Sequence, residues 1–158
     1  MRTARTIAAL VFLLVSGIAA SAAQSDLQTF ARDELVLALR DGARHTFAVE
    51  VATSRDQKAQ GLMFRPSLAP DAGMLFVYKA EGLRTMWMKN TLIPLDMLFI
   101  DRRGEIVEIA ERSVPLSLAT ISSDRPAMAV LELNGGTAAR LEIRPGDRVI
   151  HGAFEAGP

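Results

Sequence analysis

The chain has 158 residues, with 18 Lys and Arg against 18 Asp and Glu, two His and no Cys. This charge balance provides no field that would attract nucleic acid or a strongly acidic partner. The absence of Cys excludes disulfides, thiol nucleophiles, Cys-ligated zinc and iron–sulfur clusters, and two His make a multi-His centre unexpected. We therefore predict no metal site and no cofactor. At 49% hydrophobic residues the chain can bury a core, and its length suits one domain behind a processed segment.

The first 23 residues are typical of a secretory signal peptide. Arg2 and Arg5 precede an apolar run at residues 7–20, and small residues follow around Ala22 and Ala23. The run is short for a membrane span, which needs about 20 apolar residues, so we favour a cleaved signal over an uncleaved anchor. Cleavage leaves a net charge of −2. We expect a periplasmic or secreted protein without a stable membrane anchor.

In the first half of the mature chain, alternation of polar and apolar residues predicts strands over 34–40 and 45–52, joined by an Asp-Gly hairpin turn. Ser54 and Gln57 have the spacing of a capping box, which predicts a short helix that ends near residue 63. The second half contains most of the strands. Apolar or alternating runs of strand length lie at residues 74–78, 84–89, 95–100, 105–111, 127–133 and 148–153.

These elements predict a mainly β fold with seven or eight short strands and one or two short helices. A small domain of this kind forms a compact β-sandwich or a partly closed barrel. We place this single domain at residues 33–158, behind a flexible lead-in at residues 24–32.

Several motifs of the chain resemble those of a known family. They are Gly61-Leu62-Met63-Phe64-Arg65, Trp87-Met88-Lys89-Asn90-Thr91, Ile93-Pro94-Leu95-Asp96-Met97 and Phe99-Ile100-Asp101. In this combination they resemble the bacterial and archaeal family called domain of unknown function 192 (DUF192), over residues 45–153. The resemblance implies a compact, mainly β and often exported domain for which no activity is established.

Trp87 and Lys89 are the first candidates for ligand binding. On a strand their side chains point the same way, and an aromatic face beside a cation suits a small polar ligand. The alternative is that Trp87 packs in the core while Lys89 reaches water. Asn90 and Arg65 complete the candidate ligand-binding set, because Arg can hold a carboxylate or phosphate through two N–H groups. We expect a shallow polar cleft for an anionic or sugar-like molecule.

Asp96 and Glu132 are the candidate catalytic residues. Each carboxylate lies within an apolar strand, where it must find a partner or shift its pKa. If the two share a pocket, they form an acid/base pair. The alternative for Asp96 is a structural ion pair or a turn-capping carboxylate. For Asp101, which precedes Arg-Arg-Gly, we favour initiation of a turn.

The sulfur and imidazole side chains favour structural roles. The six methionines of the mature chain suit core packing, although thioethers also bind Cu(I), and they form no Met-x-x-Met or Met/His cluster. His45 and His151 lie near opposite ends of the mature chain.

The leading hypothesis is a noncatalytic, exported binding or accessory domain for a small polar or anionic ligand. One alternative is a hydrolase or lyase that acts on envelope saccharides through the two carboxylates. Another is a structural protein of an envelope assembly. A pocket that unites charged groups favours binding or catalysis, whereas a flat apolar patch favours the structural role.

We predict that the exported protein begins near Ala23 or Gln24, because the order of charged, apolar and small residues directs cleavage there. N-terminal sequencing and the intact mass of the exported product measure the start of the chain. Recovery of the uncleaved chain in the membrane fraction would contradict the prediction.

Overall fold

A computed structural model describes residues 27–154, so the predicted signal peptide lies outside the described residues. Two short helices, α1 (Arg55–Gln60) and α2 (Thr137–Leu141), accompany nine strands. The strands are β1 (Ala31–Ala38), β2 (Arg44–Ala52), β3 (Ala72–Gly82), β4 (Thr85–Met86), β5 (Leu95–Ile100), β6 (Ile106–Ser113), β7 (Ile121–Ser122), β8 (Ala127–Asn134) and β9 (Arg148–Ile150). Neither helix in this part of the chain has the length and apolar character to cross a membrane.

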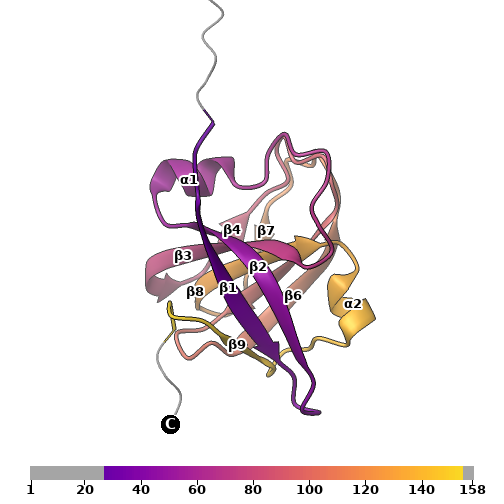
Figure 1. Cartoon of the computed structure of the whole chain (residues 1–158). Coiled ribbons are helices and arrows are strands. Elements are labelled where there is room, and N and C mark those ends of the chain that lie inside the picture. The colour runs from indigo at the N-terminus through magenta and orange to yellow at the C-terminus, as the bar shows by residue number, and fades with distance from the viewer. Residues whose placement is uncertain (1–26, 155–158) are drawn as a thin grey trace, which may run out of the picture.

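Seven strands form one sheet in the order β6-β5-β8-β3-β2-β1-β9, and β4 and β7 pair separately. All neighbours in the large sheet are antiparallel except β2 and β3. The two edges of this sheet meet where the N–H of Ile106 donates to the carbonyl of Asp147 at 2.8 Å and that of Val149 donates to Gly104 at 2.7 Å. The sheet therefore curls into a partly closed barrel (Figure 1), which is one of the two architectures expected from the sequence.

The sheet buries apolar side chains on both of its faces. Along β3, Leu75 joins the cluster on the concave face, to which β1, β2 and β9 also contribute. Met74 and Phe76 point the other way, into a second cluster on the outer face. Leu62, just after α1, and Met86 of β4 belong to this second cluster. The outer face of β3, β8 and β5 is thus covered by the segment of α1 and by the loop around β4.

Helix α1 begins as its sequence predicts. The Ser54 hydroxyl accepts from the N–H of Gln57 at 3.1 Å, and the Gln57 side-chain oxygen accepts from the N–H of Ser54 at 3.0 Å. This reciprocal pair satisfies two N–H groups that a helix start leaves free. The helix is shorter than expected because the chain turns at Gly61, whose φ is +50°. Figure 1 shows α1 and α2 at well-separated places on the barrel.

Three strands differ in extent from their predictions. β1 begins at Ala31, inside the segment expected as a lead-in, because Ala31 pairs with Val51. The strand predicted at 84–89 pairs only at Thr85–Met86, because the N–H of Thr91 bonds to the carbonyl of Met88 and turns the chain. β9 ends at Ile150, where a turn over residues 151–154 begins.

Asp96 lies on the concave side of β5 and is fully buried. Its carboxylate accepts backbone N–H groups from Arg112 at 2.8 Å, Gly136 at 2.9 and 3.0 Å, and Ala138 at 2.8 Å. The negative charge therefore fastens β6 and the start of α2 to β5, since hydrogen bonds to a charged acceptor are strong. Asp101 initiates a turn as expected, accepting the N–H groups of Arg103 and Glu105 at 2.9 Å.

We predict that Asp96→Asn destabilises the protein by about 2–3 kcal/mol. The amide nitrogen offers no lone pair to the buried N–H groups, and each unsatisfied donor costs about 1–3 kcal/mol. Urea unfolding measures the loss. Asp71→Asn, at an exposed carboxylate, is the control and should unfold like the wild type. Equal stability of all three proteins would contradict the role of Asp96.

Candidate functional site

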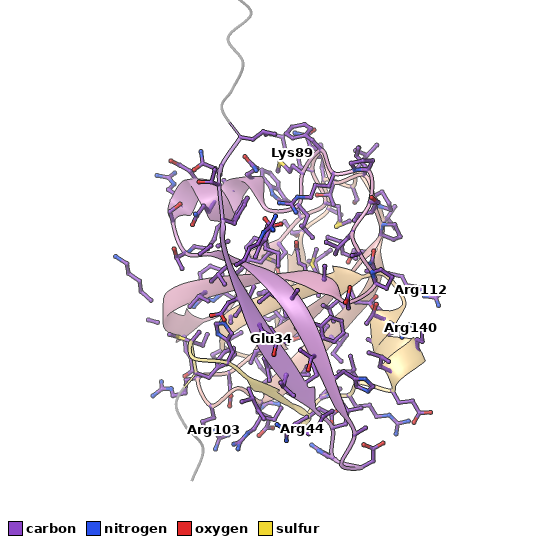
Figure 2. All side chains as sticks on the ribbon, in the orientation of Figure 1. Glu34, Arg44, Lys89, Arg103, Arg112 and Arg140 are labelled. Atoms are coloured by element: carbon purple, nitrogen blue, oxygen red, sulfur yellow. The ribbon has the colours of Figure 1, made fainter. Side chains whose placement is uncertain are left out.

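Trp87, Lys89 and Asn90 line one depression of the surface. Its volume is about 350 Å³, and its other lining residues are Leu27, Gln28, Asp56, Ala59, Gln60, Met63 and Phe64. Trp87 is 46% exposed, so it does not take the core position that was its alternative. The Lys89 ammonium lies 5.2 Å from the centre of the Trp87 ring. Figure 2 places Lys89 at the end of the barrel opposite Arg44 and Arg103.

Asn90 connects the two loops that form this depression. Its φ is +55°, a left-handed conformation that Asn tolerates better than most residues. Its carbonyl accepts the N–H of Phe64 at 2.9 Å, and its side-chain amide lies 3.8 Å from the Met63 sulfur. The loop after β4 is therefore attached to the loop after α1, and the depression forms where these two loops meet.

Arg65 lies elsewhere. Its guanidinium binds both carboxylate oxygens of Glu50 at 2.7 Å, and it lies 5.8 Å from the centre of the Phe30 ring. The pairing raises the pKa of Arg65 and lowers the pKa of Glu50, mainly through the side-chain hydrogen bonds. Arg65 therefore does not line the depression with Lys89, and its guanidinium is engaged by a residue of β2.

The two candidate catalytic carboxylates are on opposite faces of the sheet. Across the β5–β8 pair, Asp96 is opposite Leu133, and Met97 is opposite Glu132. Since side chains alternate along a strand, Asp96 points to the concave face and Glu132 to the outer face. The condition for an acid/base pair, a shared pocket, is not met.

Glu132 lies beneath the depression. Its side chain is 4% exposed, and its neighbours across the sheet are Met74 and Met97. Glu132 also lines a small chamber of about 20 Å³. Within residues 27–154, its carboxyl forms no hydrogen bond and no ion pair. Burial therefore raises the pKa of Glu132 to about 8, so the protonated carboxyl predominates at neutral pH.

The chamber and the depression adjoin. Ala59, Gln60, Met63 and Trp87 line both. The other residues that line the chamber are Lys58, Gly61, Leu62, Phe76, Met86 and Thr91. The outer depression and the inner chamber therefore form one candidate site, polar at its rim and mostly apolar at its base.

A second depression contains two arginines that the sequence does not single out. Arg112 and Arg140 line a volume of about 500 Å³ beside α2, and Figure 2 shows both at that side of the barrel. Among residues 27–154, no carboxylate forms a salt bridge with either one. The two belong to different elements without a shared motif, so only the fold brings them together. In the same part of the chain, no three His, Asp or Glu side chains are grouped to hold a metal ion.

We predict that the wild type loses stability, relative to Glu132→Gln, as the pH rises from about 4.5 to 8. The folded protein retains a proton on Glu132 that the unfolded chain releases, because the pKa is about 8 when folded and 4.5 when exposed. The stabilising effect of that proton is complete below pH 4.5 and is lost by pH 8, at about 1 kcal/mol per pH unit.

Urea unfolding of both proteins at several pH values measures this difference. Glu34→Gln, at an exposed position of β1 (Figure 2), is the control and should keep the wild-type slope. Identical slopes for wild type and Glu132→Gln would show that the buried carboxyl is ionised in the folded protein.

Comparisons with known proteins identify the family. No curated protein matches the chain. A solved structure from Sinorhizobium meliloti, provisionally described as a transcription regulator, has a TM-score of 0.79 and 44% identity, and the match covers 82% of this chain and 100% of that one. A protein of unknown function from Novosphingobium aromaticivorans has a TM-score of 0.74 and 36% identity over 96% and 99% of the two chains. The model of the uncharacterised family DUF192 matches residues 36–151, and this chain belongs to that family.

Proposed function

We propose that this chain is an exported, noncatalytic domain that binds a small polar ligand in the depression of Trp87, Lys89 and Asn90. The observation that carries the proposal is the half-exposed Trp87 ring, with the Lys89 ammonium 5.2 Å from its centre. An aromatic surface at the rim of a depression, with polar side chains around it, suits a ligand that has both an apolar face and hydroxyl groups.

A sugar-like molecule fits this lining best. Its C–H face packs on Trp87, while Asn90, Gln60 and Asp56 offer the amide and carboxylate groups that bind hydroxyls. Lys89 adds one positive charge, which suits a neutral sugar or a sugar acid. A doubly charged phosphate is less favoured, because Arg65 is engaged by Glu50. The volume of about 350 Å³ is at the small end of ligand sites, so the affinity should be modest.

Two other functions have less support. A hydrolase or lyase that uses Asp96 with Glu132 is disfavoured, because the two carboxylates lie on opposite faces of the sheet. The described role of the Sinorhizobium relative does not lead us to propose DNA binding. Equal numbers of acidic and basic residues provide no net positive field for a phosphate backbone.

We predict that neutral sugars or sugar acids raise the melting temperature of the wild type, because a ligand that binds only the folded state stabilises it. Thermal shift followed by calorimetry tests these compounds, together with phosphorylated sugars and divalent copper and zinc. Trp87→Ala should weaken binding about tenfold, which corresponds to about 1.4 kcal/mol. Lys89→Ala should weaken only the acids.

Two control variants sharpen the test. Leu118→Ser removes a side chain that is exposed but does not line the depression, and should bind like the wild type. Arg112→Ala identifies anions held in the second depression. Stabilisation by metals alone would contradict the proposal. If no compound binds the wild type, and the wild type self-associates in analytical ultracentrifugation while Leu118→Ser does not, a structural envelope protein is favoured instead.

A further inference from the structure

The chamber at Glu132 has an unused hydrogen-bonding group. A buried carboxyl without a partner is costly, and most buried polar groups in proteins are hydrogen-bonded. Glu132 is 4% exposed and lines a space of about 20 Å³, enough for one water molecule or one functional group of similar size. A group that enters the chamber and hydrogen-bonds the carboxyl would offset the free energy cost of burying it.

The charged and titratable groups near Glu132 already have other partners. From α1, the Lys58 ammonium donates to the carbonyls of Thr53 and Val77. From β3, the Tyr78 hydroxyl donates to the Met86 sulfur at 3.7 Å. The Arg84 guanidinium lies 3.9 Å from the centre of the Tyr78 ring. Burial lowers the pKa of Lys58 and raises the pKa of Tyr78. None of these groups neutralises or hydrogen-bonds the Glu132 carboxyl.

The size and charge of the chamber favour a hydroxyl group over an ammonium, a carboxylate or a phosphate. An ammonium would be repelled by Lys58, which also lines the chamber, and it would require an ionised Glu132 where burial disfavours charge. A carboxylate or phosphate is larger than the chamber, and its own charge would be buried in the same poorly solvated surroundings. A hydroxyl both donates and accepts one hydrogen bond, as an uncharged carboxyl does. It is also the size of the water that the space can hold.

We propose that Glu132 is the floor of the ligand site and binds one hydroxyl group, which the ligand inserts past Trp87 and Met63. This inference rests on the proposed function and narrows its ligand class to sugar-like or polyol compounds with a projecting hydroxyl. The route is short, because Trp87 and Met63 belong to the walls of both the depression and the chamber. The ring that packs against the ligand thus stands at the entrance to the hydroxyl-binding chamber.

Three small probes of similar size test the chamber directly: methanol, methylammonium and formate. The readout is the NMR shift of the methionine methyl groups in the purified chain. Met63 and Met86 line the chamber, and Met128, which does not, is the internal control. We expect methanol to shift Met63 and Met86 saturably and to leave Met128 unchanged. Methylammonium and formate should have at least tenfold weaker effects at pH 7.

Variants separate a hydroxyl site from a charged one. Glu132→Gln keeps a donor and an acceptor, and should bind methanol within about threefold of the wild type. Glu132→Met removes both and resembles the neighbouring Met74 and Met97 in chemistry, so the variant should fold and lose methanol binding more than tenfold. Leu118→Ser, at an exposed side chain that lines neither the depression nor the chamber, should leave the methanol response unchanged.

The outcomes that overturn the inference are distinct from failure of the proposed function. Saturation by methylammonium alone, abolished in Glu132→Gln, would make the chamber a cation site. Lack of saturation by every probe would show a closed chamber. If methanol saturates the chamber but no sugar or sugar acid binds the wild type, the hydroxyl site stands and the proposed function fails. If sugars bind and Glu132→Met leaves their affinity unchanged, the depression stands and this inference fails.

Discussion

The alternation of side chains along β5 and β8 is the constraint on which both the core and the candidate site depend. These two central strands are buried on both faces, so each residue is assigned to one of two apolar clusters by its register. The register that opposes Met97 to Glu132 also sends Asp96 to the concave face. A shift by one residue would exchange the surroundings of both carboxylates and break both clusters, so the fold and the placement of these groups are inseparable.

The apolar cluster on the outer face of the sheet is shielded from water by α1, β4 and the loops beside them. The candidate site lies among these covering segments. Because α1 has only six residues and β4 only two, neither element alone spans the outer face of β3, β8 and β5. Two loops complete it and are joined where Asn90 accepts the N–H of Phe64. A cover assembled from two loops leaves a seam between them, and the depression and chamber lie along this seam. The shortness of α1 and β4 thus explains why a cavity between the two loops reaches Glu132.

The sequence predicts the local features of this molecule well and the long-range ones poorly. The capping box of Ser54, the mainly β character, the turn at Asp101 and the placement of Trp87 and Lys89 on the same side of the chain all depend on neighbouring residues. Whether that side is exposed was left open by the sequence and is settled by the fold. The partner of Arg65 is Glu50 of β2, and no local pattern reveals that contact. The separation of Asp96 from Glu132 depends likewise on a strand register set by the whole sheet. Charged residues that the sequence singles out as one candidate set therefore need not lie together in space.

The two buried carboxyls of this sheet show how a structural group differs from a functional candidate. The sheet and α2 surround Asp96 with backbone N–H groups from three residues, which stabilise its charge and use its hydrogen-bonding capacity. Glu132 has methionines beside it and an open chamber before it. A methionine at that position would satisfy the packing of the outer cluster without burying an unpaired polar group. Within residues 27–154 no group uses the hydrogen-bonding capacity of the Glu132 carboxyl, and this distinguishes it from Asp96 as a functional candidate.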